Sequence, residues 1–372
     1  MPRRIDEPNY KRFITGEIPR FNERNTAYSM GDRSEFRPQK EIIAKGRKKN
    51  ELGYTPEDFA LFWGSRTIDY LVRKHVFTRD EKVSETKIPI DDMELWTQKV
   101  KYAARFFGAS LVGVCEINQQ WLYSHWGDHN ALLTEAAKPG DPLELPANMK
   151  YAVVMAIEMD YRDMERSPAV ANTTDLAYSQ MAFAAGSLAN FIRSLGYQAI
   201  PSGNDSGLSI PLAVDAGLGE LGRNGQLITA EYGPRVRLCK VFTEFPLIPD
   251  KPVDLRVQHF CQVCKKCAEH CPSGAISNDE LTDQPVNISS SRGVLKWPIN
   301  AHKCYKFWYH NGSWCANCIR SCPWNKPNTL FHKINRNFIM KIPSTHSLFV
   351  WIDDVFGYGK QRVRSWNLNG KT

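Results

Sequence analysis

The sequence lacks any hydrophobic run long enough to form a membrane-spanning helix. It also lacks an intact export leader, because Arg3-Arg4 is followed by Ile-Asp-Glu-Pro-Asn and no apolar segment develops there. No internal repeat is evident beyond two runs of cysteines. We therefore expect a chain that does not cross a membrane, and that is either cytoplasmic or a mature form whose leader has been removed.

Cysteine carries the most information, since eight of the ten cysteines fall into two runs. The runs read Cys261-x2-Cys264-x2-Cys267-x3-Cys271-Pro272 and Cys304-x10-Cys315-x2-Cys318-x3-Cys322-Pro323. Such spacing is typical of [4Fe–4S] ligands, and in two-cluster ferredoxins the cysteine before proline ligates the other cluster. The sequence therefore predicts one cluster on Cys261, Cys264, Cys267 and Cys322, and a second on Cys271, Cys304, Cys315 and Cys318.

Two other uses of these cysteines fit the pattern less well. Structural zinc sites usually pair two C-x2-C units around one ion. Disulfide frameworks belong to small secreted chains, whereas this chain has 372 residues, of which 42% are hydrophobic. The remaining cysteines, Cys115 and Cys239, lie in strand-like segments, and we expect both to be inert core thiols.

Composition divides the chain into four segments. Residues 1–90 are polar, broken by prolines and studded with aromatics, which predicts an extended arm that wraps the body. Residues 91–245 are expected to form the core, with an inserted lobe at about 116–148. Residues 246–330 hold the cysteine runs, and residues 331–372 form a basic, aromatic tail that we expect to pack back on the body.

Within the core, the spacing of apolar residues predicts strands that alternate with helices. Helices are expected over 93–107 and 175–195, the second capped by Thr173 or Thr174 and ended by Gly196. Strands are expected over the apolar stretches 110–115, 151–157, 197–201 and 235–242. These elements predict an α/β or α+β core.

The segment Gly217-Leu-Gly219-Glu-Leu-Gly222 matches the dinucleotide pattern G-x-G-x-x-G letter for letter. That pattern needs a buried strand before it, a helix after it and an acidic residue about twenty positions later. Here a short proline-started stretch precedes it, Arg223-Asn-Gly-Gln follows, and Lys240 stands near the acidic position. We reject nicotinamide or flavin binding, and expect the glycines to form tight turns or to let the backbone approach a large flat ligand.

Three blocks precede the cysteine runs: Gly203-Asn-Asp-Ser-Gly207, Gly217-Leu-Gly-Glu-Leu-Gly-Arg-Asn-Gly-Gln-Leu-Ile228 and Tyr232-Gly-Pro-Arg-Val-Arg-Leu238. In this order, the chain resembles the corrinoid-dependent reductive dehalogenases of organohalide-respiring bacteria. The resemblance implies an α+β fold with a nitroreductase-like core that binds a base-off corrinoid, beside a ferredoxin-like domain with two [4Fe–4S] clusters. It also implies that the corrinoid cobalt, reduced to Co(I), removes halide from a small organohalide.

Residue roles follow from the same resemblance. By motif match, the proton-donating tyrosine falls on Tyr178, the arginine that supports its phenolate on Arg237, and the asparagine that helps to orient the substrate on Asn204. No D-x-H-x-x-G motif is present, which agrees with a cobalt that has no histidine ligand. Replacing carbon–halogen by carbon–hydrogen needs two electrons and one proton, and two one-electron clusters near a cobalt can supply the electrons in sequence.

Further residues are expected around the corrinoid. The glycine-rich block suggests cofactor contacts at Gly219, Gly222, Arg223 and Asn224. Three aromatic residues between the cysteine ligands are expected to wall the pocket beside the cobalt: Trp308, Tyr309 and Trp314. Each assignment has an ordinary structural alternative, because buried tyrosines often only pack, strand arginines often form salt bridges, and aromatics often pack around a cluster.

Two other functions stay open. An epoxyqueuosine-reductase-like enzyme would share the corrinoid core and clusters but act on tRNA, with an acidic proton donor; the block Tyr232-Gly-Pro-Arg-Val-Arg237 favours the dehalogenases. A pure electron-transfer protein would not need the large core. Despite a net charge of +8, no basic stripe is evident, so we expect no nucleic-acid partner.

The resemblance also implies partners and a location. It suggests a low-potential electron donor, a small membrane-anchor protein and a possible homodimer. The expected location is the outer face of the cytoplasmic membrane, reached by twin-arginine export, with a cytoplasmic location as the alternative.

Overall fold

A computed structural model describes the chain except for residues 1, 34, 37, 70–81, 135–136 and 364–372. Its centre is a four-stranded antiparallel sheet in the order β2-β3-β7-β4. The strands are β2 (Leu111–Glu116), β3 (Tyr151–Glu158), β7 (Val236–Thr243) and β4 (Ala199–Ser202). All four predicted strands are present, with ends shifted by one or two residues.

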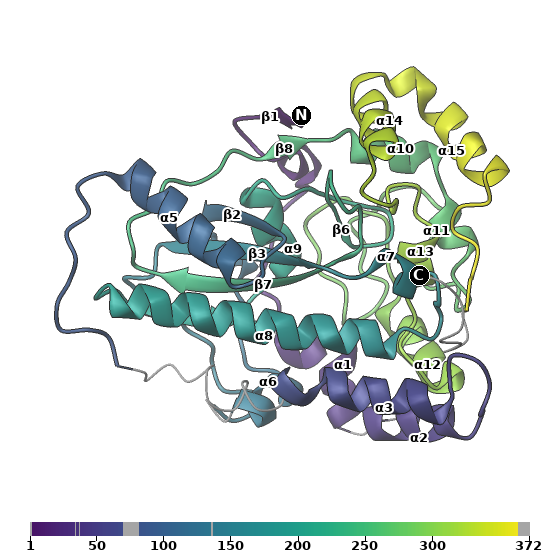
Figure 1. Ribbon diagram of the computed structural model, residues 1–372, viewed down its shortest axis with the longest axis horizontal. Coiled ribbons are helices and arrows are strands. Elements are labelled where there is room, and N and C mark those ends of the chain that lie inside the picture. The colour runs from purple at the N-terminus through teal and green to yellow at the C-terminus, as the bar shows by residue number, and fades with distance from the viewer. Residues whose placement is uncertain (1, 34, 37, 70–81, 135–136, 364–372) are drawn as a thin grey trace.

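Both faces of the sheet are covered, which explains why its strands read as continuous apolar runs. Alternate residues of β3 enter two different cores: Val153 and Met155 pack on one side, Ala152 and Val154 on the other. The first side is covered by α5 (Met93–Phe106) and α8 (Ala171–Ser194), and the second by α9 (Ser209–Asp215) (Figure 1). The fold is therefore α+β, as the sequence predicts.

The start of α8 differs from the prediction. The helix begins at Ala171, and its N-cap residue Val170 makes no side-chain capping bond, so Thr173 and Thr174 lie inside the first turn instead of capping it. Val170 is fully buried, and its backbone N–H donates to the carbonyl of Trp314. A long-range contact thus fixes this helix end where a local cap was expected.

The N-terminal arm wraps the body but is partly helical. It contains β1 (Arg3–Arg4), η1 (Asn9–Phe13), η2 (Glu23–Asn25), α1 (Ala27–Asp32), α2 (Gln39–Arg47) and α3 (Pro56–Ser65). The expectation of an extended arm was wrong at α3, where Thr55 and Asp58 form a capping box and Pro56 occupies the first turn. The arm packs α3 on α8 and α2 on α12 (Figure 1).

The remaining segments are short helices and hairpins around the sheet. They comprise η3 (Gln119–Trp121), α6 (Asp128–Thr134), α7 (Tyr161–Met164), β5 (Glu220–Leu221), β6 (Leu227–Ile228), β8 (Val253–Asp254), α10 (Val257–Val263), α11 (Lys266–Glu269), α12 (Ala301–Asn311) and α13 (Asn317–Arg320). Among the described helices, none is both long and apolar enough to cross a membrane.

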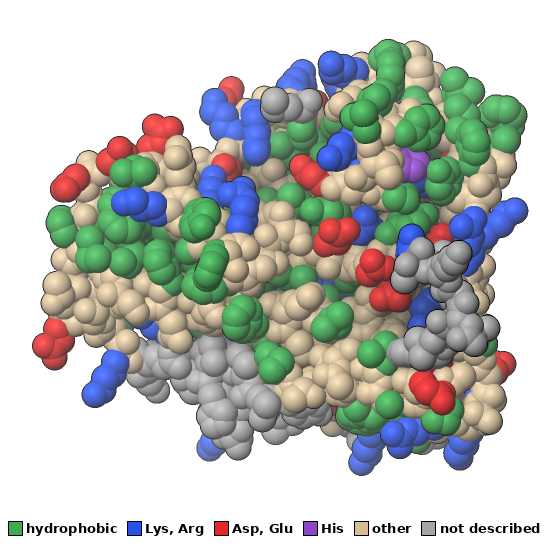
Figure 2. All heavy atoms as spheres, in the orientation of Figure 1, with side chains coloured by type: hydrophobic (Ala, Val, Ile, Leu, Met, Phe, Trp, Pro, Cys, Tyr) green, Lys and Arg blue, Asp and Glu red, His purple; other side chains and the backbone are tan. Residues whose placement is uncertain are grey.

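The C-terminal tail forms α14 (Leu330–Lys341), η4 (Pro343–Thr345) and α15 (His346–Val355). It packs against the cysteine-bearing segment, since Ile339 joins a core with Phe260 and Trp324. Lys266 also pairs with Asp353 at 2.5 Å. The outer sides of α14 and α15 expose large apolar side chains, which gather at the upper right of Figure 2.

Candidate active site

A cavity with a volume of about 550 Å³ lies where three parts of the chain meet. Tyr178 and Asn204 line it from the core, Tyr28 and Ser29 from the arm, and Trp297 from the cysteine-bearing segment. A cavity of this size, mostly apolar with a few converging polar groups, is typical of a small-molecule or cofactor site. It brings together residues more than 250 positions apart.

Tyr178, Asn204 and Arg237 form one group at this cavity. The Asn204 side-chain amide Nδ2 donates to the Tyr178 hydroxyl at 2.9 Å, and the Arg237 guanidinium lies 5.3 Å from the Tyr178 ring centroid. Tyr178 comes from α8, Arg237 from β7 and Asn204 from the loop after β4. The Tyr178 hydroxyl is thus bonded by an amide, and its ring lies beside a guanidinium that carries a permanent charge.

The Arg237 side chain has a limited set of protein partners. Its Nη2 donates weakly to Thr174 Oγ1 at 3.5 Å, and its buried Nε has no hydrogen-bond partner. None of the described ion pairs contains Arg237, although its charge acts to lower the pKa of the buried Asp175, which burial raises. A buried guanidinium N–H without an acceptor is available to an anion that forms nearby.

Tyr28 is a site residue that the sequence did not reveal. Its ring packs edge-on against Trp308 and Tyr305, each at 5.7 Å between centroids. Burial, with a smaller contribution from Tyr178, raises its pKa well above the usual value although Arg237 opposes this, so Tyr28 stays neutral. Nothing in the polar arm distinguishes Tyr28 from its neighbours until the arm folds over the core.

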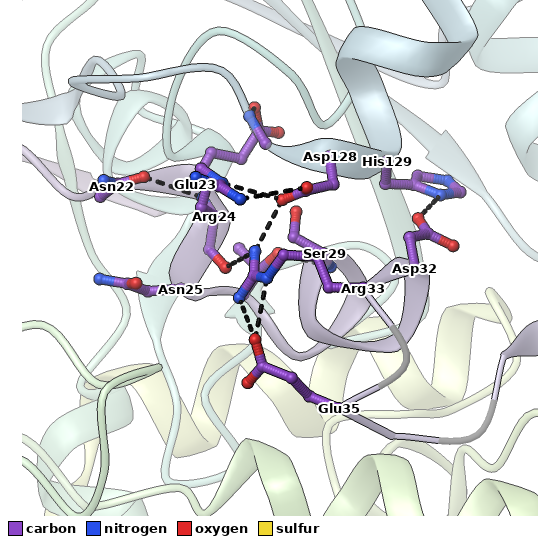
Figure 3. A network of polar contacts seen from close by, with 12 residues as sticks. Asn22, Glu23, Arg24, Asn25, Ser29, Asp32, Arg33, Glu35, Asp128 and His129 are labelled. Carbon is purple, nitrogen blue, oxygen red and sulfur yellow. Dashed lines mark hydrogen bonds and ion pairs between the residues drawn. The ribbon is translucent and has the colours of Figure 1, made fainter. Parts of the chain in front are cut away.

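A network of ion pairs holds the arm at the cavity (Figure 3). The Asp128 carboxylate of α6 accepts from Arg24 Nε at 3.1 Å and from Arg33 Nη1 at 2.6 Å. Burial alone would raise the pKa of Asp128, but the bonds and charges of Arg24 and Arg33 outweigh it and lower the pKa. His129 Nδ1 lies 2.8 Å from the Asp32 carboxylate in the same network. These contacts tie α1 to α6 and thereby place Tyr28.

Glu23 completes the attachment from a buried position. It is 2% exposed, and its carboxylate accepts from the Gly127 backbone N–H at 2.7 Å and from the Asn130 side-chain amide. Burial raises the pKa of Glu23 to about 7, although both hydrogen bonds act to lower it. The folded protein therefore binds this proton more tightly than the unfolded chain, in which a glutamate titrates at about 4.3.

This difference predicts how stability depends on pH. The contribution of Glu23 is fully present below pH 4.3 and is lost as the pH rises to about 7. As the pH rises from 4.3 to about 7, the free energy of unfolding of the Glu23→Gln variant is expected to fall by about 2–3 kcal/mol less than that of the wild type. Thermal unfolding of both proteins between pH 5 and pH 8 measures the difference; parallel profiles would contradict it. Asp175, whose pKa burial raises to about 6, contributes equally to both proteins.

The three predicted aromatic residues occupy different places. Trp314 lines the cavity, and its Nε1 donates to the buried Asp175 carboxylate at 2.6 Å. Trp308 lies behind it, 5.5 Å from the Trp314 ring, and contacts Tyr28. Tyr309 carries the Lys45 ammonium 4.5 Å from its ring and is not among the lining residues. A role beside the cobalt stays a prediction for all three.

The glycine-rich block forms the hairpin β5–β6 and opens no helix, which agrees with the rejection of a dinucleotide site. A Cβ at Gly219 would lie 2.2 Å from the Ile228 carbonyl oxygen, so close strand approach requires glycine there. Gly222 lines the cavity. Arg223 and Asn224 turn toward the cysteines, since Arg223 Nε donates to the Cys261 carbonyl at 3.0 Å and Asn224 Nδ2 to the Cys318 carbonyl at 3.3 Å.

Four of the eight predicted cluster ligands surround one small cavity. A small second cavity, beside Arg223 and Asn224, is lined by Cys261, Cys264, Cys267 and Cys322. Burial raises the pKa of Cys318 well above its usual value, and the charges of Cys315, Cys304, Cys271 and Cys322 add to this effect. Cys271 and Cys318 pack against the buried cluster that contains Cys267, so predicted ligands of both clusters lie close to one another.

Within the described part of the chain, no group of three or more His, Cys, Asp or Glu side chains is arranged to hold a single metal ion. A lone zinc ion would draw its sulfur ligands to about 2.3 Å from one point. Cysteines arranged around a cavity fit a four-iron cluster better than a single ion. Cys115 and Cys239 lie apart in the sheet and are 2% and 0% exposed, as expected for core thiols.

Comparisons with known proteins agree with this arrangement. Residues 260–325 match the family model of a 4Fe-4S double cluster binding domain. The chain is 33% identical to a tetrachloroethene reductive dehalogenase of Sulfurospirillum multivorans over 398 aligned positions, which cover 97% of this chain and 78% of the relative. It is 39% identical to a tetrachloroethene reductive dehalogenase of Dehalobacter restrictus, covering 70% of this chain and 54% of the relative.

A solved reductive dehalogenase, whose structure is described as suggesting a mechanism for B12-dependent dehalogenation, superposes with a TM-score of 0.73. It is 25% identical and covers 97% of this chain, but the chain covers 49% of that protein. The chain thus belongs to the reductive dehalogenase family. It spans about half the length of several of the relatives that it matches.

Proposed function

We propose that this protein reductively dehalogenates a small organohalide, replacing a carbon–halogen bond by a carbon–hydrogen bond. The observation that carries the proposal is the group Tyr178–Asn204–Arg237, which lies at a cavity that is also lined by Trp314, the neighbour in sequence of the predicted cluster ligand Cys315. A proton source and an electron path at one cavity are what the reaction requires, because it consumes two electrons and one proton and releases halide.

We propose that this cavity also holds a corrinoid. A large flat macrocycle with amide groups at its rim needs room, uncharged hydrogen-bonding partners and backbone without side chains. The lining offers these features: Gly222, Gly225, Gln258 and the serine run 289–291. Trp297 is 4% exposed and lines the cavity, and its buried indole N–H has no protein acceptor. When bound, the corrinoid would supply the two-electron reduction of the carbon–halogen bond.

The residues of this chain would then handle the proton and the electrons. Tyr178 would donate its hydroxyl proton to the carbon that loses halide, and Asn204 and Arg237 would stabilise the phenolate until solvent returns a proton. The proposed cluster ligands are the two groups of cysteines described above. Arg223 and Asn224, which bond the backbone of both cysteine segments, are proposed to link the cofactor side of the cavity to the clusters.

Partners and location are part of the proposal. A low-potential donor would supply the electrons, and a small membrane-anchor protein would hold the enzyme at the outer face of the cytoplasmic membrane. The apolar side chains exposed on α14 and α15, such as Leu330, Trp351 and Val355, offer a surface for such a contact (Figure 2). The large core with this cavity distinguishes the proposal from an electron-transfer protein without a substrate.

Halide release tests the proposed function. The protein, loaded with iron, sulfide and corrinoid under anaerobic conditions, would be supplied with reduced viologen and with chlorinated alkanes, alkenes and phenols in turn. Release of chloride from at least one class is expected, and that class defines the substrate. A fully loaded protein that releases halide from none of them would contradict the proposal and favour the tRNA-modifying alternative.

A further inference from the structure

Lys240 is a buried cation that the reaction described above does not use. It lies in the middle of β7, opposite Ser202 of β4, and is 0% exposed. Its side chain leaves the sheet on the face opposite that of Arg237, because the two are three residues apart on one strand. A lysine is rarely buried completely unless it has several fixed partners.

Its partners are the backbone carbonyls of one short loop. Lys240 Nζ donates to the carbonyl oxygens of Gly203 at 2.7 Å, Asp205 at 2.8 Å and Gly207 at 3.2 Å, and lies 3.2 Å from Ser209 Oγ. An ammonium has three N–H donors, so these contacts use its full capacity. The carbonyls of alternate residues in 203–207 therefore converge on a single buried atom.

The loop is held in a conformation that it would not adopt easily by itself. Ser206 has a positive φ of 64°, which is uncommon for a residue with a Cβ. The Asp205 carboxylate helps from within the loop, since it accepts from the Gly203 N–H at 2.7 Å and from the Ser206 hydroxyl at 2.8 Å. The surrounding contacts must maintain this conformation, and Lys240 supplies the largest number of them.

Asn204 is the residue that this loop presents to the cavity. It is exposed, whereas its neighbours Gly203, Asp205 and Ser206 are buried. Its amide reaches the Tyr178 hydroxyl at 2.9 Å. Lys240 contacts the backbone on both sides of Asn204, at Gly203 and at Asp205. These contacts therefore fix the backbone position from which the Asn204 side chain extends.

We propose that Lys240 is a positioning residue, which clamps the loop 203–207 and thereby sets the Asn204–Tyr178 hydrogen bond. The proposal rests on the proposed function in that it assigns Tyr178 as the proton donor. Without the ammonium, the carbonyls of Gly203 and Gly207 lose this donor, whereas the Asp205 carbonyl keeps the Ser202 hydroxyl and the Gly207 N–H. The loop then has to rearrange for the Gly203 and Gly207 carbonyls to reach water or other donors. The amide would then move away from the phenol that it orients.

A double-mutant cycle tests this coupling. Lys240→Met keeps the length of the side chain and removes the charge and the donors, and is expected to lower kcat about 10- to 100-fold, as small displacements of positioned groups do. In an Asn204→Ala background, the same change is expected to have little further effect, because the group that it positions is already absent. Fully additive losses would overturn the proposal.

Val241→Ala is the matched control. Val241 is the next residue on β7, is 0% exposed and enters the opposite core, so its truncation weakens the same strand without touching the loop. Its effect on kcat is expected to be small and additive with Asn204→Ala. A Val241→Ala variant that reproduces the Lys240→Met pattern would show that general destabilisation, and not the clamp, is being measured.

Amide hydrogen exchange provides a readout that does not depend on turnover. In Lys240→Met, peptides that cover 199–211 are expected to exchange at least tenfold faster than in wild type, while Val241→Ala leaves them unchanged relative to the rest of β7. Equal exchange in Lys240→Met and wild type would overturn the clamp. Failure of the proposed function would appear differently, as no halide release by the wild-type protein, and the exchange measurement would still decide the role of Lys240.

Discussion

The Tyr178→Phe variant is expected to retain its cofactors but to release halide about 10²- to 10⁴-fold more slowly than the wild type. A positioned general acid typically contributes a factor of this size to the rate. Phenylalanine keeps the ring that lies under the Arg237 guanidinium and removes only the hydroxyl that Asn204 contacts. The proton then has to come from water. Initial rates of halide release, measured with reduced viologen at saturating substrate, give the ratio directly.

Tyr197→Phe is the control for this experiment. The Tyr197 hydroxyl donates to the Ile88 carbonyl at 2.8 Å, and the residue is not among those that line the cavity. Its loss removes one hydrogen bond of about 1 kcal/mol and is expected to leave turnover unchanged. Unaltered halide release in Tyr178→Phe, with full cobalt and iron content, would remove Tyr178 from the mechanism.

The second large effect is expected at the cysteines. Cys264→Ser removes a proposed ligand of one cluster and Cys318→Ser a proposed ligand of the other. The iron content of each variant is expected to fall from about eight to about four irons per chain. Each variant is also expected to lose nearly all viologen-driven halide release, because both clusters carry the electrons in sequence. Iron content and the electron paramagnetic resonance spectrum of the reduced protein measure the loss cluster by cluster.

Cys239→Ala separates cluster loss from damage to the fold. Cys239 is 0% exposed, and burial raises the pKa of its thiol to about 12, as for an unreactive core residue. Truncation in the core costs stability but is expected to leave the iron content intact. If Cys264→Ser or Cys318→Ser kept all of its iron, the assignment of that cysteine would be wrong.

The sequence pattern predicted correctly those strands and helix ends that are determined by residues close together in the sequence. The strands over 151–157 and 235–242 are apolar throughout and form the two central strands of the sheet. The helix ending at Gly196 was also placed correctly at that end, since Gly196 has a φ of 87°. The other end of the same helix was misplaced because a contact from Trp314, more than 140 residues away, replaces a local cap.

Other features of the site could not be read from sequence, for a similar reason. Tyr28 gains its place only because Arg24 and Arg33 of the arm meet Asp128 (Figure 3). In the sequence, Lys240 was notable only because it stands where a dinucleotide-binding motif would need an acidic residue. Its partners in the structure are backbone carbonyls, which no sequence pattern reveals. The cysteine runs could be interpreted from the sequence because their spacing is set by the geometry of a cluster and not by the rest of the fold.

The stoichiometry of electrons and halide tests the central claim most directly. Protein loaded with iron, sulfide and corrinoid would be given a limiting amount of reduced viologen, and viologen oxidised and halide released would be counted together with the dehalogenated product. We predict two viologens oxidised per halide released and per product formed, with no halide when the corrinoid is omitted. Halide release that continues without corrinoid, or without oxidation of viologen, would contradict reductive dehalogenation at this cavity.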